Sequence, residues 1–354
     1  MSRTLLALAA AALVAGCGDG SRKSDSAAVP STSTASGADL TGAGATFPYP
    51  LYSKWFDAYA QKTGTKINYQ SIGSGGGIRQ LSEQTVDFGA TDAPMSDAEL
   101  AKAKGGAVLH IPTALGAVAI TYNLPGVTQT LKLDGDVLAA IFLGQITKWN
   151  DARIAALNAG VALPATDVLV VHRSDGSGTS YVFTDYLSTV STAWAAKPGK
   201  GKEVQWPVGL GGKGNDGVTG QVKQTPGAIG YVELAYANQN KLPTVQLKNA
   251  AGEFVAPNVA SVTAAAAGAA AKLPSNTDYR VSVVNAPGKG VYPISSFTWI
   301  IAYAKQSDAA KGKKLKDFLH WALTDGQGME AALDYAPLPE SMRSALGARV
   351  DSIQ

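Results

Sequence analysis

The sequence predicts an α/β fold of two lobes, and three observations support this prediction. Short runs of β-branched residues alternate with helical patterns from Leu40 onward, an order typical of α/β proteins. The chain has 354 residues, enough for two domains of roughly 100–200 residues each. Its hydrophobic content of 45% suffices for sizeable cores and excludes a mostly disordered chain. Because no Pro/Ser-rich linker divides the folded part, we expect the chain to cross between the lobes more than once.

Local patterns place the individual elements. The strand candidates are the ranges 66–72, 86–90, 118–122, 168–172, 228–232, 244–247, 280–284 and 297–303. Pro48 and Pro50 suit the first turn of a helix, in which Leu51, Trp55 and Tyr59 then recur at helical spacing. Further helices are expected from a capping box at 96–99, an apolar stripe at 182–190 and an Ala-rich run at 259–271.

Composition excludes several classes of function. Charged residues are 16%, against about 25% in a typical domain, and the net charge of +3 comes without any run of Lys or Arg. A nucleic-acid partner is therefore not expected. A single Cys excludes a CxxC site, and three scattered His residues argue against a His-rich metal site. We predict neither a metal nor a cofactor.

The N-terminus has the pattern of an export signal. Arg3 precedes an apolar run from Leu5 to Val14, whose length fits the roughly 7–15 residues of a signal peptide and not the roughly 20 of a membrane span. The run Val-Ala-Gly-Cys at 14–17 resembles a bacterial lipobox, so residues 1–16 are predicted to be removed and Cys17 to be lipidated. An ordinary secretory signal with a chance Cys is the alternative. Small and polar residues at 17–38 predict a flexible tether.

Glycine-rich corners are the most informative feature of the folded part. They lie at 41–47, 73–77, 175–180 and 209–217, each before a helical pattern. The unpaired N–H groups of a helix N-terminus attract anions, and Gly lets a ligand approach the backbone closely. Each corner alone could be a capped turn. Neither the GxGxxG pattern nor the Walker A pattern fits any corner, so the corners together indicate a small anion and not a nucleotide.

Two charged residues sharpen the anion hypothesis. Arg173 ends a predicted strand just before the 175–180 corner, and Asp92 ends another within Thr91-Asp92-Ala93-Pro94. A carboxylate at a strand end before Pro commonly starts a turn. In a site built of donors, it could instead accept a proton carried by the ligand and repel an anion that has none.

The corners lie within motifs that resemble the family of periplasmic phosphate-binding proteins of bacterial high-affinity phosphate ABC transporters, the PstS family. The motifs are TGAGATFPYPLYSKW (41–55), NYQSIGSGGG (68–77), VDFGATDAPMS (86–96), HRSDGSGTSYVFTDYL (172–187), WPVGLGGKGNDG (206–217), PGAIGYVE (226–233) and YPISSFTWI (292–300). The resemblance implies a two-lobed periplasmic-binding-protein (Venus flytrap) fold, type II-like, with a hinge, that closes on one phosphate. We expect lobe I to comprise 39–112 plus 292–354, and lobe II to comprise 113–291.

The resemblance also implies the ligand contacts. Phosphate would be bound by Thr46, Phe47, Ser74, Asp92, Arg173, Ser177, Gly178 and Thr179, with Asp175 holding the Arg173 guanidinium. His172 and Ser174 depart from the pattern at positions that are not ligands in the family, and His172 is expected to face away from the ligand.

The function that follows is capture of phosphate and its delivery to the permease and ATPase subunits of an ABC importer, in the periplasm and anchored through Cys17. A binding protein for another oxyanion, such as sulfate or molybdate, is the first alternative. A phosphatase-like enzyme is the second, but no GxSxG elbow surrounds Ser74 or Ser177, so we expect no catalysis.

Overall fold

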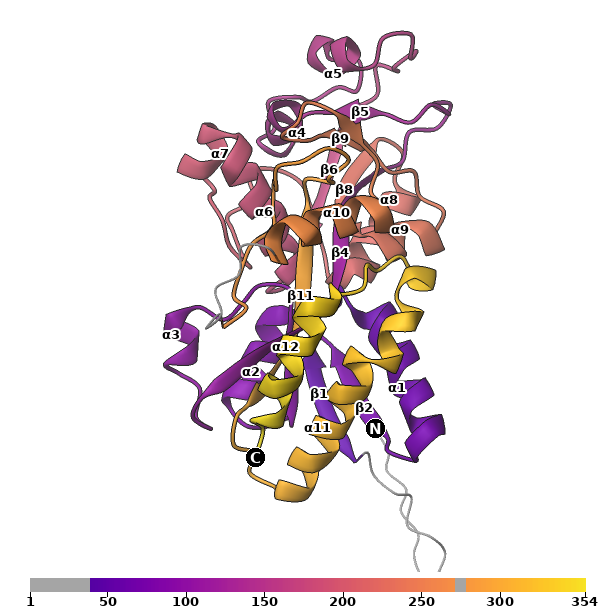
Figure 1. Cartoon of the computed structure of the whole chain (residues 1–354). Helices are drawn as coiled ribbons and strands as arrows, with labels where there is room; N and C mark the ends of the chain where they lie inside the picture. Colours follow the sequence, from indigo (N-terminus) through magenta and orange to yellow (C-terminus); the bar gives the residue numbers. More distant parts are fainter. Residues whose placement is uncertain (1–38, 271–277) are drawn as a thin grey trace, which may run out of the picture. The chain divides into compact units, whose positions relative to one another are not determined.

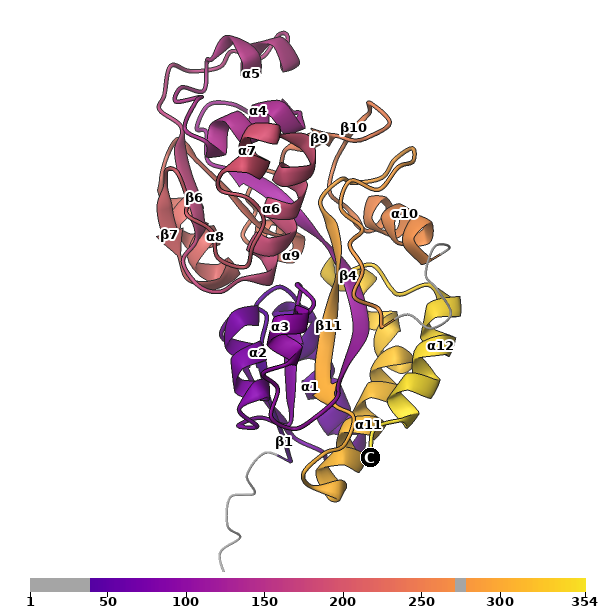
Figure 2. The same ribbon diagram turned by 90° about the vertical axis from the view of Figure 1, so that its left-hand side faces the viewer.

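The computed structural model describes residues 39–270 and 278–354; the predicted signal peptide, Cys17 and tether lie outside these ranges. Residues 38–354 form one compact unit. Its main sheet has eight strands in the order β2-β1-β3-β11-β4-β8-β6-β7, and a second sheet has the order β10-β9-β5. In Figure 2, α2 and α3 lie on one side of β4 and β11, and α11 and α12 lie on the other.

The elements run as follows along the chain. The strands are β1 (Leu40–Gly44), β2 (Ile67–Ser71), β3 (Phe88–Thr91), β4 (Val108–Tyr122), β5 (Lys132–Leu133), β6 (Leu169–Arg173), β7 (Leu210–Gly212), β8 (Ala228–Glu233), β9 (Gln246–Lys248), β10 (Phe254–Val255) and β11 (Ser295–Tyr303). The helices are α1 (Tyr49–Thr63), α2 (Ser74–Ser82), α3 (Asp97–Leu100), α4 (Gly135–Phe142), α5 (Ala152–Leu157), α6 (Gly178–Val190), α7 (Thr192–Ala196), α8 (Gly214–Gln224), α9 (Leu234–Gln239), α10 (Val259–Ala270), α11 (Ala309–Leu323) and α12 (Glu340–Asp351). Two short 3₁₀ helices, η1 (Asp325–Met329) and η2 (Ala331–Leu333), follow α11.

Strand β4 joins two lobes. Its first part pairs with β11, which in turn pairs with β3, whereas its last five residues, 118–122, pair with β8. Strands β2, β1, β3 and β11 therefore belong to lobe I, and β8, β6 and β7 to lobe II, with β4 continuous through both (Figures 1 and 2). This confirms the predicted two-lobed α/β fold. The predicted divisions after residues 112 and 291 stay predictions.

Most predicted elements are present, with two informative differences. Strand β4 begins ten residues before the predicted range 118–122. Pro112 interrupts the β-strand pattern in the sequence, so this earlier part was not predicted. In the structure Pro112 lies at a bulge, where the register shifts opposite Thr298 and Trp299. The range 280–284 was predicted to be a strand, and this is wrong. It has no regular secondary structure and ends in a turn at Val284, between two residues of positive φ, Tyr279 and Asn285, which end extended pairing.

The glycine corners also differ in detail from the expectation. Helix α2 begins at Ser74 and α6 at Gly178, inside the corners and four residues before the predicted helical stripes. The corner residues therefore form the first turns of the helices, where the backbone amides have no acceptor within the helix. Glycine is required at Gly44, where φ is +145° and an added Cβ would lie 2.1 Å from the carbonyl oxygen of Ala90.

No helix in residues 39–270 or 278–354 is both long and apolar enough to cross a membrane.

Candidate anion-binding site

The predicted site residues converge from both lobes. In lobe I, Thr46 and Phe47 follow β1, Ser74 opens α2 and Asp92 follows β3. Strands β1 and β3 are parallel neighbours, so their carboxyl ends meet at one edge of the sheet. In lobe II, Arg173 ends β6, and the segment 177–179 opens α6. None of these side chains is more than 3% exposed.

Three hydroxyl groups of the site have their lone pairs occupied. Ser74 Oγ accepts from the amides of Gly178 (3.1 Å) and Asp92 (3.3 Å). Thr46 Oγ1 accepts from the amide and the side-chain nitrogen of Asn215 (3.2 and 2.7 Å). Thr179 Oγ1 accepts from Asn215 Nδ2 (3.2 Å) and from an Arg173 nitrogen (3.3 Å).

A hydroxyl has two lone pairs and one proton. Since both lone pairs of each oxygen are engaged by protein donors, each hydroxyl is left with only its proton to offer. The site therefore presents donors and favours a ligand rich in acceptors, such as an oxyanion.

Arg173 supplies the buried positive charge. Its Nε and one terminal nitrogen donate to the two oxygens of Asp175 at 2.8 and 2.6 Å. Gly214 adds an amide donor to the same carboxylate at 2.9 Å. Burial acts to raise the pKa of Asp175, but the hydrogen bonds and charge of Arg173 outweigh it and lower the pKa. Of the five guanidinium N–H donors, three are engaged by Asp175 and Thr179, which leaves two for a ligand.

Asp92 is the acidic residue at the centre of the cluster. One carboxylate oxygen accepts from Thr298 Oγ1 at 2.9 Å. Burial raises the pKa of Asp92 to about 7, although the Thr298 hydrogen bond and the Arg173 charge act to lower it. Near neutral pH this carboxyl can therefore either accept or donate a proton.

The two lobes are in contact around the cluster. The amide of Gly75 in lobe I donates to the carbonyl of Gly176 in lobe II at 2.8 Å. Lys202 Nζ forms an ion pair with Glu99 at 2.8 Å. These contacts, together with the Gly178–Ser74 bond, indicate that the structure shows the lobes closed.

Two residues of the cluster were missed at the sequence level. Asn215 connects Thr46 and Thr179 and also accepts from the amide of Glu233 at 2.9 Å. Its position in the glycine corner 209–217 was a usable signal. Thr298, the partner of Asp92, lies in the middle of β11, 206 residues further along the chain. Only the sheet topology brings these two together.

The remaining predicted residues fall into distinct environments. Ser177 Oγ caps α6 by accepting from the amide of Ser180 at 3.0 Å. Phe47 packs its ring edge-on against Tyr335 with centroids 6.4 Å apart, so any contact with a ligand falls to its backbone. The His172 ring stacks on that of Trp206, with ring centroids 4.7 Å apart. Among the described residues, no group of His, Cys, Asp and Glu side chains could hold a metal ion.

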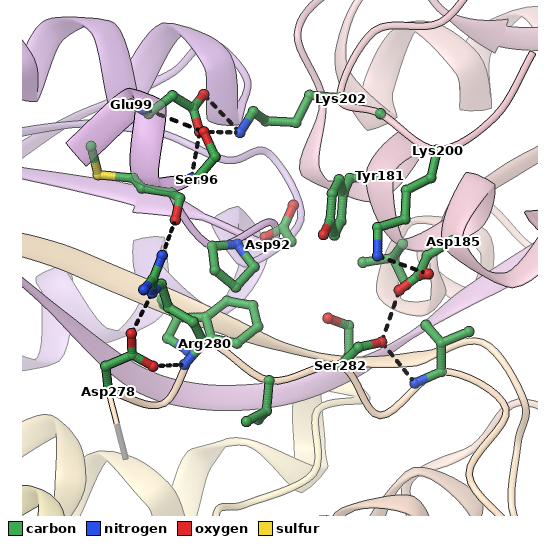
Figure 3. Close-up of a pocket in the computed structure, with 18 residues that line it drawn as sticks. Asp92, Ser96, Glu99, Tyr181, Asp185, Lys200, Lys202, Asp278, Arg280 and Ser282 are labelled. Carbon is green, nitrogen blue, oxygen red and sulfur yellow. Dashed lines mark hydrogen bonds and ion pairs between the residues drawn. The ribbon is translucent and has the colours of Figure 1, made fainter. Parts of the chain in front are cut away.

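A pocket of about 650 Å³ adjoins the cluster and has Asp92 in its wall. Its cations are already paired: Lys202 with Glu99, Lys200 with Asp185, and Arg280 with Asp278 (Figure 3). Each of these cations therefore has a carboxylate partner. Apart from Asp92, the predicted ligand residues lie in the buried cluster and not among the residues that line this pocket.

Comparison with known proteins agrees with this description. The chain matches the family model of the PBP superfamily domain over residues 29–326. The phosphate-binding protein PstS of Xylella fastidiosa is 45% identical over 348 residues, covering 96% of this chain and 94% of the relative. PstS of Pasteurella multocida is 47% identical over 304 residues, covering 86% and 87%.

Solved structures share the fold. The phosphate-binding protein of Stenotrophomonas maltophilia superposes with a TM-score of 0.72 at 22% identity, covering 89% of this chain and 94% of that one. The high-affinity periplasmic phosphate-binding protein PfluDING, solved with bound phosphate, gives 0.70 at 24% identity, covering 88% and 93%. The chain belongs to the PstS family of phosphate-binding proteins within the PBP superfamily.

Proposed function

We propose that this protein captures inorganic phosphate between its two lobes outside the cytoplasm and delivers it to the membrane subunits of an ABC importer. It is a binding component and not an enzyme, in keeping with the relatives that are named for phosphate binding. The bound anion is held by the Thr46 hydroxyl, the Phe47 amide and Ser74 from lobe I, and by Arg173, Ser177, Gly178 and Thr179 from lobe II. Asp92 sets the selectivity, and Asp175 holds Arg173 in place.

The observation that carries this proposal is the saturation of the three buried hydroxyls by protein donors. A site of this kind stabilises an anion through dipoles and one guanidinium, without a matching number of cations. Phosphate near neutral pH keeps a proton for Asp92, whereas sulfate has none. An ionised Asp92 facing sulfate would leave two acceptors opposed in a buried site, which can cost a factor of about 10⁴ in affinity.

The test is calorimetric titration of residues 38–354, the compact unit, with phosphate, sulfate and molybdate at pH 8. We expect phosphate to bind and to raise the melting temperature, and the other two anions to do neither. Tighter binding of sulfate or molybdate than of phosphate would replace the proposal with the other oxyanion. Hydrolysis of a phosphate ester by the purified protein would support the enzymatic alternative.

The membrane anchor is a separate proposal that rests on the sequence at 14–17. We propose that lipidated Cys17 ties the protein to a membrane and that residues 18–38 act as a tether. A full-length Cys17→Ala variant should move from the membrane fraction to the soluble extracytoplasmic fraction, with its affinity for phosphate unchanged. Retention of this variant in the membrane fraction would exclude the anchor.

A further inference from the structure

Three tyrosine hydroxyls donate to three consecutive backbone carbonyls beside the site. Tyr69 Oη donates to the carbonyl of Ala45 at 2.8 Å. Tyr236 Oη donates to the carbonyl of Thr46 at 2.5 Å, and Tyr335 Oη to that of Phe47 at 2.6 Å. The three tyrosines come from β2, α9 and the segment after η2, so residues 69, 236 and 335 meet at a single stretch of chain only in the fold.

The peptide bonds between residues 45 and 47 are trans. In a trans peptide the carbonyl of one residue and the amide of the next point in opposite directions. A hydroxyl that holds the Ala45 carbonyl therefore aims the Thr46 amide the opposite way, and a hydroxyl on the Thr46 carbonyl does the same for the Phe47 amide. Within residues 39–270 and 278–354, neither amide donates a hydrogen bond, although both residues are at most 3% exposed.

Phe47 is followed by Pro48, which has no N–H, so the third tyrosine aims no donor. Its effect is to hold the Phe47 carbonyl, an acceptor, away from an anion. Tyr335 Oη also lies 3.0 Å from Glu233 Oε2. The Tyr335 hydroxyl therefore shares its one proton between the Phe47 carbonyl and the Glu233 carboxyl group, both of which accept from it. Burial raises the pKa of Glu233 well above its usual range.

We propose that Tyr69, Tyr236 and Tyr335 are positioning residues for phosphate, which orient the peptide units of residues 45–47 so that the Thr46 and Phe47 amides face the anion. The inference rests on the proposed function. Tyr236 has a second role, because it reaches from α9 in lobe II to Thr46 in lobe I. Its hydrogen bond exists only when the lobes are closed, and it also polarises the Phe47 amide at that moment. Burial raises the pKa of all three tyrosines well above the usual value, so each stays a donor.

The experiment is to measure phosphate binding by Tyr236→Phe and Tyr69→Phe, with Tyr303→Phe as the control. Tyr303 is 4% exposed, and its hydroxyl donates to the carbonyls of Leu81 and Ser82, at the far end of α2 from Ser74. We expect Tyr236→Phe to weaken binding at least tenfold, mainly through faster dissociation, since its bond forms after the lobes meet. Tyr69→Phe should weaken binding by about threefold to tenfold, and Tyr303→Phe should leave it within twofold.

The amide proton shift of Phe47 in phosphate-bound protein provides the readout that a merely structural role would not move. It should shift upfield in Tyr236→Phe and stay in place in Tyr303→Phe. The inference would be overturned if both site variants bound phosphate with dissociation constants within threefold of the wild-type value and the Phe47 resonance did not move. Should Tyr236→Phe fail to fold, Tyr69→Phe and the Thr46 resonance decide by the same criteria. Absence of phosphate binding by the wild-type protein would instead contradict the proposed function.

Discussion

The amide of Gly178 donates to Ser74 Oγ at 3.1 Å and thereby joins the first turns of α6 and α2 across the two lobes. A Cβ at position 178 would lie 2.5 Å from Ser74 Oγ and 2.7 Å from the amide nitrogen of Asp92. These distances are too short for any side chain. Glycine at this position is therefore a condition for closing the lobes and not for forming the helix.

Gly178→Ala should fold normally and bind phosphate at least tenfold more weakly, because the added methyl keeps the lobes apart. Gly220→Ala in α8 is the matched control, since a Cβ there meets nothing within 4 Å. We expect the control to keep its affinity and to gain about 0.5–1 kcal/mol of stability from the better helix former. Calorimetry measures the affinity, and chemical unfolding measures the stability.

The same closure should be visible in the wild-type protein. Phosphate should reduce the radius of gyration and slow hydrogen exchange in both 41–47 and 175–181, the segments that face each other from the two lobes. In Gly178→Ala the slowing should be reduced in both segments. Protection of only one segment at saturating phosphate would contradict a site shared between the lobes.

Arg173→Ala should weaken phosphate binding by several kcal/mol, because a buried charge-assisted contact is lost. Arg153→Ala is the control: Arg153 makes the same forked contact with Asp151, but at the surface, where such pairs contribute little. A change of less than about threefold in the dissociation constant of Arg173→Ala would exclude Arg173 as a ligand, since about 1.4 kcal/mol corresponds to tenfold.

Asn215 gives a test of the saturated hydroxyls. In Asn215→Asp the side-chain donor to Thr46 and Thr179 is replaced by an acceptor, so both hydroxyls can turn their protons toward the new carboxylate and away from the anion. We expect phosphate binding to weaken by at least tenfold. Asn158→Asp serves as the control, since Asn158 is 5% exposed and bonds to the backbone of Lys132 and Ile154. An unchanged affinity in a folded Asn215→Asp protein would show that the hydroxyls do not depend on Asn215.

The sequence predicted the parts of this site that lie close together along the chain. The corner at 175–180 carries its helix cap, its glycine and the partner of Arg173 within a few residues, so local pattern sufficed. The contacts of Asn215 and of the three tyrosines depend on residues 24 to 288 positions away, and no local pattern contains them.

The fold shows the same division between local and long-range features. Short β-branched runs predicted β6 and β8 but not the first half of β4. Pro112 interrupts the β pattern there, and it is tolerated because it lies at a bulge in the pairing with β11. The range 280–284 reads as β-branched, yet no strand in the described residues pairs with it. Instead Arg280 bonds to Asp278 and Asp97, and Ser282 to Asp185.

Asp92 provides the last prediction, which concerns selectivity and pH. Burial raises its pKa from 3.8 to about 7. Below about pH 7 the carboxyl carries a proton and can donate it to sulfate, and above that pH it can only accept. Sulfate affinity should therefore be measurable at pH 5 and should fall by up to tenfold for each pH unit above about 7, the slope of a single proton.

Asp92→Asn removes this titration, because the amide can donate to sulfate and accept from phosphate at every pH. The variant should keep phosphate binding within about two orders of magnitude and bind sulfate with an affinity that no longer depends on pH.

The raised pKa also means that ionising Asp92 opposes folding, since the unfolded state releases this proton near pH 3.8 and the folded state only near pH 7. As the pH rises from about 3.8 to about 7, the stability of the phosphate-free wild-type protein should thus fall, and in Asp92→Asn this part of the fall should be absent.

Competition titrations of phosphate against sulfate at fixed ionic strength test whether Asp92 sets the selectivity. If a folded Asp92→Asn protein kept the phosphate-to-sulfate ratio of the wild type at pH 8, Asp92 would be a turn former, and selectivity would have to arise from the donors alone.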